Sequence, residues 1–222
     1  MFYKNLLIAI DGPSSSGKGT IAKKIASHFQ IPCLNTGGLY RAIAFLALSD
    51  DLDLEKDQAK IIPLCGKIID MDLESPNLHN EQIGKAASTI AANHNIRKAI
   101  FDLQRNFAID GLKEKGGAVL EGRDIGTVIC PDANYKFFIT AAAEVRARRR
   151  YEQLSTSFKE SGQEGVCDAN YDLILEQLKK RDWQDQNRQT SPLKKAVDAI
   201  EIDSSKMNIK EVFDFMLKSF KD

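Results

Sequence analysis

Residues 12–20 read Gly12-Pro13-Ser14-Ser15-Ser16-Gly17-Lys18-Gly19-Thr20 and stand between two patterned segments of this 222-residue chain. A continuous apolar run, residues 6–11, precedes them, and apolar residues at helical spacing follow from Ile21. A buried strand, a glycine-rich turn and a helix in this order bring backbone N–H groups together at the start of the helix, where they can bind phosphate oxygens. Glycine in the turn allows close approach of the backbone to a ligand. The sequence therefore predicts a phosphate-binding loop at residues 12–20.

The end of this loop carries the side chains expected to contact a nucleoside triphosphate. Lys18 is long enough to reach the β- and γ-phosphates, and Thr20 is expected to orient Mg²⁺ or to hydrogen-bond a phosphate. In the general motif Ser or Thr follows the lysine directly, whereas Gly19 intervenes here. This G-K-G-T form resembles that of the nucleoside monophosphate kinases. An ordinary Gly/Ser turn is the alternative, and it leaves the strand and helix context unexplained.

The rest of the chain alternates between apolar runs and helical patterns. Further short strands are predicted at residues 31–35, 118–121, 136–140 and 199–203. Helices are predicted at residues 39–48, about 57–69, 82–92, 96–115, 143–159, 171–189 and 209–220. Such alternation predicts an α/β fold with a parallel sheet and helices on both faces. Residues 70–80 have no clear period and are interpreted as a loop in a small accessory lobe, and residues 161–165 as a break between two charged helices.

Three further motifs place charged residues where ligands bind in such sheets. Arg41 begins a helix after a Gly turn, and Arg123 and Asp124 follow the strand at 118–121. Ligands bind outside the carboxyl ends of parallel strands, so these groups are expected in one cleft. At positions i, i+4 and i+7 of a predicted helix, Arg181, Asp185 and Arg188 share one face that continues an apolar stripe. Taken singly, each motif also fits an ordinary surface arginine or an ion pair on an exposed turn or helix.

A run of arginines precedes the break at residues 161–165. Its members are Arg146, Arg148, Arg149 and Arg150. Arginines on a closing segment can neutralise a transferring phosphoryl group and exclude water. The sequence thus favours an arginine-rich lid, although each residue alone also fits a surface charge.

Composition excludes several other classes of protein. The 31 basic residues balance 31 acidic ones, which disfavours a general nucleic-acid or anionic-membrane binder. Neither the four cysteines nor the three histidines have metal-ligand spacing, so reduced, mostly buried thiols are expected. We find no signal peptide and no apolar segment near the ~20 residues that span a bilayer. A cytoplasmic monomer with no nucleic-acid or membrane partner is the expectation.

Four segments, in this order, closely resemble the bacterial cytidylate kinase family, also called cytidine monophosphate kinases. They are G-P-S-S-S-G-K-G-T, L-N-T-G-G-L-Y-R, E-G-R-D-I-G-T-V-I-C-P-D-A and K-K-R-D-W-Q-D-Q-N-R. The resemblance covers nearly the whole chain and implies transfer of the γ-phosphoryl group of ATP to CMP or dCMP with Mg²⁺. It also implies a P-loop three-layer fold: a five-stranded parallel sheet flanked by helices, with a monophosphate-binding lobe and a lid. The expected parts are a core at about 1–66 and 95–222, the lobe at about 67–94 and the lid at about 146–188.

Roles for individual residues also follow from the resemblance. Residues 12–20 would hold ATP, and Lys18, Arg41, Arg123, Arg181 and Arg188 would be catalytic. Around the cytosine the resemblance places Thr36, Ser88, Arg97 and Asp124. Arg41 and Arg123 would clamp the acceptor phosphate, and Arg181, Asp185 and Arg188 would bridge the acceptor sugar and phosphates.

This chain departs from the family pattern at three places. Thr36 stands where serine is typical, the accessory stretch at about 67–82 is short, and the lid helix carries Gln184 and Gln186 where arginines are common. The alternatives are a P-loop kinase for another small acceptor, such as UMP, AMP or shikimate, and a P-loop module that binds nucleotide without catalysis. The Arg123-Asp124 turn argues against the first, and the several arginines argue against the second.

Overall fold

The computed structural model describes residues 5–160 and 170–220 of the chain. At its centre lies a five-stranded, all-parallel sheet with the strand order β2-β3-β1-β4-β5. The strands are β1 (Leu6–Asp11), β2 (Cys33–Asn35), β3 (Gly117–Gly122), β4 (Tyr135–Thr140) and β5 (Ile200–Asp203). All five predicted strands are confirmed. β1 lies between β3 and β4 and is covered on both faces, which explains its continuous apolar sequence.

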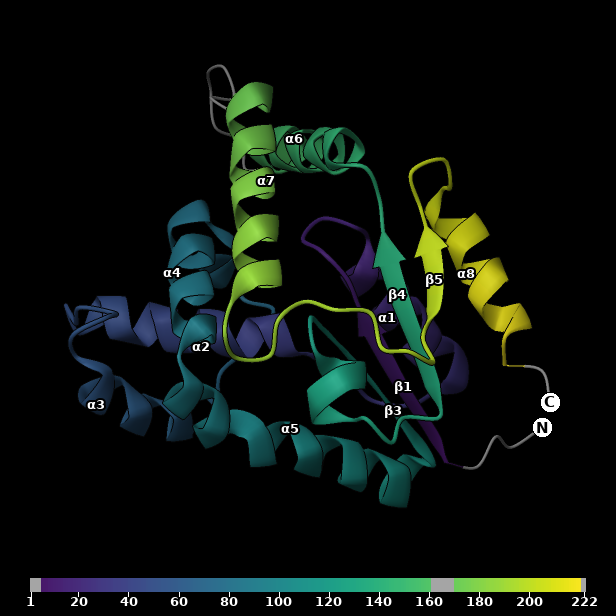
Figure 1. The fold of residues 1–222 in the computed structure, drawn as a ribbon, viewed down its shortest axis with the longest axis horizontal. Helices are drawn as coiled ribbons and strands as arrows, with labels where there is room; N and C mark the ends of the chain where they lie inside the picture. Colours follow the sequence, from purple (N-terminus) through teal and green to yellow (C-terminus); the bar gives the residue numbers. More distant parts are fainter. Residues whose placement is uncertain (1–4, 161–169, 221–222) are drawn as a thin grey trace.

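Helices surround this sheet. They are α1 (Lys18–Phe29), α2 (Thr36–Ser49), α3 (Gln58–Ile61), α4 (Glu81–Ala92), α5 (His94–Lys115), α6 (Ala143–Glu160), α7 (Tyr171–Asn187) and α8 (Ile209–Lys218). Two short 3₁₀ helices, Ile62–Gly66 and Pro76–His79, and one π-helical turn, Ile125–Ile129, complete the described elements. In Figure 1, α6 and α7 lie beyond the carboxyl ends of β4 and β5, α8 flanks β5, and α5 runs below the sheet.

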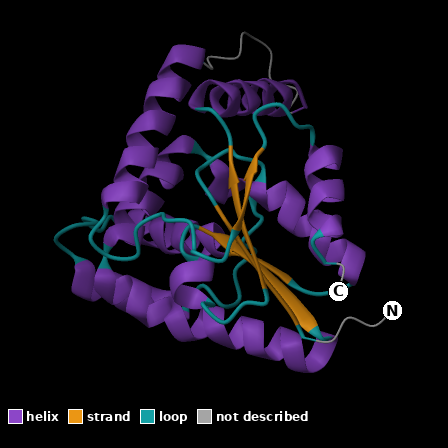
Figure 2. Cartoon of the chain, turned by 45° about the vertical axis from the view of Figure 1, so that its right-hand side comes forward, coloured by secondary structure: helices purple, strands orange, loops and turns teal. Residues whose placement is uncertain are grey.

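Alternate side chains of β1 supply two separate cores. Ile8 and Ile10 pack with residues of α1 and α8, including the fully buried Met216. Leu7 and Ala9 point to the other face and pack with residues of α2 and α5. Figure 2 shows the twisted strands enclosed between helices, so the architecture has three layers, as predicted.

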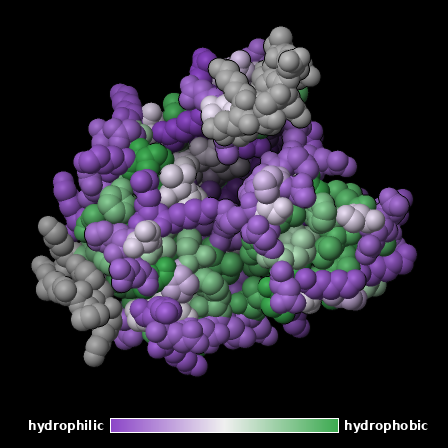
Figure 3. Space-filling view, turned by 180° about the vertical axis from the view of Figure 1, so that it is seen from behind, coloured by the Kyte–Doolittle hydropathy of each residue, from purple (hydrophilic) through white to green (hydrophobic). Residues whose placement is uncertain are grey.

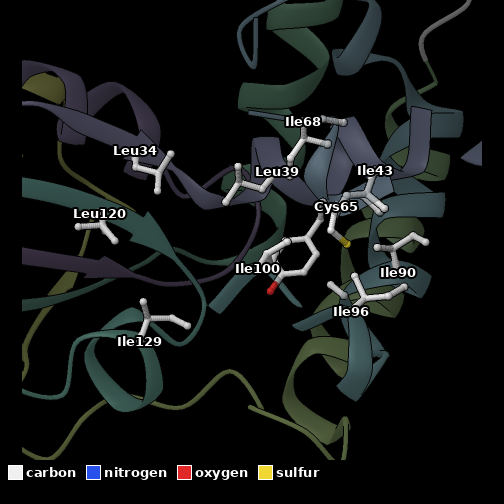
Figure 4. Packing of buried hydrophobic residues seen from close by; sticks show 14 of the residues in the cluster. Leu34, Leu39, Ile43, Cys65, Ile68, Ile90, Ile96, Ile100, Leu120 and Ile129 are labelled. Carbon is white, nitrogen blue, oxygen red and sulfur yellow. The ribbon is translucent and has the colours of Figure 1, made fainter. Parts of the chain in front are cut away.

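The segment around α4 shares the larger of these cores. Ile68 and Ile90 belong to the same buried cluster as Ile43 of α2 and Ile96 of α5 (Figure 4). Residues 70–80, where a loop was expected, contain turns and one 3₁₀ helix, with no strand. The expected accessory lobe is therefore packed continuously against α2 and α5 through apolar side chains.

α6 and α7 have a small apolar core of their own. Ala147, Ile174 and Leu178 are buried between the two helices, with Tyr151 and Leu154 packed against them. This pairing resembles the lid that the sequence predicts at about 146–188. The predicted break at 161–165 lies outside the described residues, as does Cys167.

Several element boundaries differ from the predicted ones, and prolines account for two of the differences. The helix expected at 57–69 is α-helical only over Gln58–Ile61 and then narrows to a 3₁₀ helix, because Pro63 has no N–H to donate. β2 begins at Cys33 rather than residue 31. Pro32, which precedes it, has no N–H to donate to a neighbouring strand, although its carbonyl accepts from the Val119 N–H. α7 ends at Asn187, so Arg188 is extended rather than helical.

On the face seen in Figure 3, hydrophilic side chains surround several apolar areas. In the two described ranges, none of the helices combines the length and apolar character needed to cross a membrane. Cys65 and Cys130 are buried free thiols, and Cys33 is a half-buried one.

Candidate active site

The loop between β1 and α1 has a backbone that only glycine permits at its first position. Gly12 has φ +148°, and a Cβ there would come within 2.0 Å of the Ile139 carbonyl oxygen. Gly17 has φ 92° and precedes α1 without a side-chain cap. The first N–H groups of α1 are therefore left for a ligand, and the helix dipole adds partial positive charge at the same point.

Lys18 lies buried inside this loop. Its Nζ donates to the Pro13 carbonyl at 2.9 Å, and the side chain is 5 % exposed. Burial, together with the neighbouring Arg123 and Arg181, lowers the pKa of Lys18 to about 7. The Ser16 Oγ is also buried, with no hydrogen-bond partner in the described part of the chain. Lys18 with its remaining N–H donors and the Ser16 hydroxyl can both donate to the oxygens of an anionic ligand.

A cavity of about 670 Å³ opens from this loop between α4 and α7. Its walls include Ser14 and Ser15 from the loop, Arg41 from α2, Ser88 from α4, and Arg181 and Asp185 from α7. The cavity is large enough for a small-molecule ligand. Residues predicted from three separate sequence motifs thus line one space, whereas Arg123 and Asp124 are not among its lining residues.

Two arginines meet at a glycine on the cavity wall. A Cβ on Gly84 would lie 3.5 Å from Arg41 Nη2 and 3.9 Å from Arg181 Nη1. Burial lowers the pKa of each guanidinium to about 10, with Arg123 adding like-charge repulsion in both cases. Arg41 Nη1 donates to the Leu78 carbonyl at 2.8 Å, whereas Arg181 Nε is buried with no partner among the described residues. Neither guanidinium is within ion-pair distance of a described carboxylate, so the two cations together form a site for an anion such as phosphate.

Arg123 is paired with a carboxylate, that of Asp185, on the wall of the cavity. Its Nε donates to Asp185 Oδ2 at 2.9 Å, and both side chains are largely buried. Although burial lowers the pKa of Arg123, the Asp185 carboxylate raises it above its usual range. Conversely, although burial raises the pKa of Asp185, Arg123 and Arg181 hold it below its usual range. The pair joins the turn after β3 to α7.

Asp124 forms a second ion-pair network beside the first. Arg97 of α5 donates to its Oδ2, and Arg188 Nη2 lies 3.7 Å from its Oδ1. Arg188 Nη1 is also 3.9 Å from Asp185, so it links the two networks although it lies one residue beyond α7. The Arg97 guanidinium lies over the Tyr40 ring, 5.4 Å from its centroid. Of these residues only Asp185 and Arg188 line the cavity, and the network connected to them offers both donors and acceptors, which suits a base or a sugar better than a phosphate.

Thr36 and Ser88 also have defined positions. Thr36, the first residue of α2, is 3 % exposed and donates its hydroxyl to the Glu121 carbonyl at 2.9 Å. Ser88 donates to the Gly84 carbonyl one turn earlier in α4, at 3.3 Å, and lines the cavity. Each hydroxyl oxygen keeps lone pairs with which to accept from a ligand.

The arginine-rich segment of α6 is less free than the sequence predicts. Arg146 is 4 % exposed, with Nη1 and Nη2 bound to Asp182 of α7 at 3.1 and 2.6 Å. Nη1 also donates to the Ser14 carbonyl, and Nε to the Ala141 carbonyl. Arg149 is bound to Ser204. Of this segment Arg150 lines the cavity. Arg146 thus ties α6, α7 and the phosphate loop together instead of reaching for a ligand.

Sequence reasoning missed several residues of the site. No feature of the sequence marks Gly84 as a site residue, because its role depends on the approach of two arginines from other helices. Asp182 follows Arg181 in the sequence but faces α6. It therefore does not share the helix face of Arg181 and Asp185, from which the site was predicted. Glu121, at the end of β3, lies with Oε1 3.3 Å from where a Cβ on Gly19 would stand. Its position after a strand was the only available signal.

Comparisons with known proteins agree on one family. The family model described as Cytidylate kinase matches residues 8–222. The cytidylate kinase of Bartonella tribocorum is 43 % identical over 210 residues, covering 95 % of this chain and 92 % of that protein. The cytidylate kinase of Methylocella silvestris is 42 % identical, with 94 % and 90 % covered. Among solved structures, an uncharacterized protein from Eubacterium ventriosum shares the fold, with a TM-score of 0.51, 19 % identity, and 97 % and 98 % covered.

Proposed function

Since this chain belongs to the cytidylate kinase family and transfers a phosphoryl group from ATP to CMP or dCMP, we propose that the cavity between α4 and α7 is where transfer occurs. The observation that carries this assignment is the meeting of Arg41 and Arg181 at Gly84, both half-buried and neither in an ion pair with a described carboxylate. A monophosphate placed there would supply the missing negative charge. The phosphate loop opens into the same cavity, as a donor site requires.

The donor ATP lies along residues 12–20 in this proposal. Backbone N–H groups at the start of α1 bind its phosphates, and Lys18 turns from the Pro13 carbonyl to the β- and γ-phosphate oxygens. Ser16 Oγ gains the partner that it lacks. The donor polyphosphate also restores the ammonium form of Lys18, because a nearby anion favours the charged state.

The residues beside the loop suit Mg²⁺. Thr20 presents an exposed hydroxyl in the first turn of α1, and the Glu121 carboxylate lies close to Gly19. These are the hard oxygen donors that Mg²⁺ prefers, and phosphate oxygens would complete its shell. When bound, the ion supplies charge neutralisation at the β- and γ-phosphates.

The acceptor CMP lies across the two ion-pair networks. Arg41, Arg123 and Arg181 hold its phosphate, and Asp185 and Arg188 contact its sugar. The base lies near Asp124, Arg97, Thr36 and Ser88, which together offer acceptors to the cytosine amino group and donors to its carbonyl.

The reaction in this arrangement is a direct in-line transfer with no covalent enzyme intermediate. A phosphomonoester has its second pKa near ~6, so the attacking oxygen is already ionised at neutral pH and no general base is needed. Catalysis then consists of holding the two phosphates in line and stabilising charge that spreads over the transferred group. Lys18, Arg41, Arg123 and Arg181 provide this stabilisation.

Steady-state kinetics of two variants test the assignment. Lys18→Ala and Arg181→Ala should keep the fold but lower kcat by at least ~10³-fold, the lower range for loss of an arginine that binds the transferring group. Lys179→Ala, two residues from Arg181 and paired with Glu144 away from the cavity lining, is the matched control and should change kcat little. Near-normal kcat in Lys18→Ala or Arg181→Ala, with circular dichroism unchanged, would remove that residue from the catalytic machinery.

A further inference from the structure

Asp11, the last residue of β1, is a buried carboxylate to which the proposed function gives no task. It is 4 % exposed and directly precedes Gly12, the start of the phosphate loop. Its Oδ1 accepts from the Ile125 N–H at 2.9 Å, and its Oδ2 accepts from the Gly126 N–H at 2.8 Å. Both carboxylate oxygens are thus bound to consecutive backbone amides of a segment far away in the sequence.

Those two amides begin an unusual element. Ile125–Ile129 forms a π-helical turn, a rare conformation that frequently occurs at functional sites. The side chain of Asp124, the residue before the turn, does not cap it. Asp11 takes that role from another strand, since its carboxylate satisfies two amides at the start of the turn.

The turn directly follows Arg123 and Asp124. The backbone of Arg123 and Asp124 connects the end of β3 to the two N–H groups that Asp11 binds. The position of those N–H groups therefore limits where the Arg123 and Asp124 side chains can lie. Asp124 has φ −142° and ψ 24°, a conformation that belongs to neither β3 nor the turn. An anchor just after this residue therefore fixes the step from the strand to the turn.

Other side chains support the same segment at its far end. Lys136 Nζ donates to the Pro131 carbonyl at 2.6 Å, and Arg105 donates to the Ile129 carbonyl and binds Asp132. These contacts lie five or more residues beyond Asp124 in the chain. Asp11 is the support adjacent to Arg123 and Asp124, and it comes from the strand that leads into the phosphate loop.

We propose that Asp11 is a positioning residue that sets Arg123 and Asp124 in register with the phosphate loop, and so couples the acceptor site to the donor site. The inference rests on the proposed function, because it takes Arg123 and Asp124 as acceptor-binding groups. Asp11 itself is too buried and too fully bonded to contact either nucleotide.

The charge state of Asp11 matters for this role. Burial raises the pKa of its carboxyl to about 6, while its bonds from Gly126 and Ile125 and the nearby Lys18 act in the opposite direction and Asp124 raises it further. The alkyl chain of Lys136 packs at Gly126 on the same side. When the carboxyl binds a proton, one of its oxygens becomes a hydroxyl and one of the two amides loses its acceptor. Acidification through this range should therefore loosen the turn.

Asp11→Asn is the direct test, because the amide keeps the shape but can accept at only one end. We expect KM for CMP to rise at least ~10-fold, while the Kd for ATP changes less than ~3-fold. Asp132→Asn is the control: it weakens the Arg105 contact at the far end of the same segment, and KM for CMP should stay within ~2-fold. Asp124→Asn is measured alongside to test the acceptor site itself.

The outcomes separate the inference from its premise. If Asp124→Asn weakens CMP but Asp11→Asn does not, or if Asp11→Asn weakens ATP as much as CMP, the positioning role is wrong and the proposed function stands. If Asp124→Asn leaves CMP affinity intact, the acceptor assignment is wrong, and the inference, which depends on it, is wrong as well.

A second measurement on the unaltered protein applies if Asp11→Asn does not fold. Amide hydrogen exchange of Ile125 and Gly126 is followed by NMR from about pH 7.5 to about pH 5, corrected for intrinsic exchange rates. Protection of both amides should fall as Asp11 takes up its proton near pH 6, with no matching fall at Val119 in the middle of β3. Unchanged protection at Ile125 and Gly126 would overturn the role of the carboxylate.

Discussion

At the scale of single residues, Lys18 is the group whose protonation should report nucleotide binding. Before ATP binds, burial and two arginines hold its pKa at about 7, so near pH 8 the amine is mostly neutral. Phosphate oxygens favour the ammonium ion, so binding at about pH 8 should take up close to one proton, since the usual lysine pKa is ~10.4.

Titration calorimetry in two buffers of different ionisation enthalpy measures this uptake. Lys18→Met is the comparison variant and should show almost none. A proton count near zero for the unaltered enzyme at about pH 8 would contradict the low pKa of Lys18.

Thr36 and Asp124 are the residues that should discriminate between bases. Thr36→Val removes the hydroxyl that binds the Glu121 carbonyl, and Asp124→Asn removes the charge opposite Arg97. Both should reduce the preference for CMP over UMP more than they reduce ATP affinity, because we propose that both groups contact the base. Thr36→Ser keeps the hydroxyl and should retain the preference. The ratio of kcat/KM for CMP and UMP measures the effect, and an unchanged ratio would place the base elsewhere.

At the scale of elements, the joint between α6, α7 and the phosphate loop depends on Arg146. Its guanidinium is bound to Asp182 and to the Ser14 carbonyl, and both side chains of the ion pair are largely buried. Removing one partner from such a pair leaves an unpaired charge and typically costs about 3–5 kcal/mol. Arg146→Leu should therefore destabilise the protein strongly in urea unfolding.

The double variant Arg146→Leu, Asp182→Leu is the informative comparison. It removes both charges, so part of the lost stability should return. Equal or greater destabilisation in the double variant would mean that the ion pair is not what joins these elements.

Much of this arrangement follows from patterns along the chain, and the remainder follows from contacts across it. The strand, loop and helix around Gly12 and Lys18 are predictable because their signals are local. The helix face with Arg181 and Asp185 is predictable from periodicity. Gly84 and Asp11 are not, because each acts on residues brought close only by the folded sheet and helices. Prolines explain the early end of α3 and the late start of β2.

At the scale of the whole molecule, the site is a local excess of positive charge in a chain with no net charge. Arg181 is half-buried, its buried Nε has no hydrogen-bond partner among the described residues, and burial and Arg123 lower its pKa. Holding it as a cation at neutral pH thus costs folding free energy, as at many functional sites. Arg181→Gln should raise the melting temperature by about 2–4 °C, the shift for ~1 kcal/mol in a chain of this size, while kcat falls.

Differential scanning calorimetry with and without inorganic phosphate checks this balance. Phosphate should stabilise the unaltered protein more than Arg181→Gln, because the anion neutralises the cluster. A lower melting temperature for Arg181→Gln would show that the arginine stabilises the fold.

The most direct measurement of the central claim is ADP production from Mg-ATP with CMP, dCMP, UMP and AMP side by side, with Lys18→Ala as the blank. If the cavity between α4 and α7 holds a cytosine nucleotide, CMP and dCMP should react fastest and Lys18→Ala should show only background. Faster reaction with UMP or AMP, or no reaction with any acceptor, would contradict the assignment of Arg123, Asp124 and their neighbours to CMP.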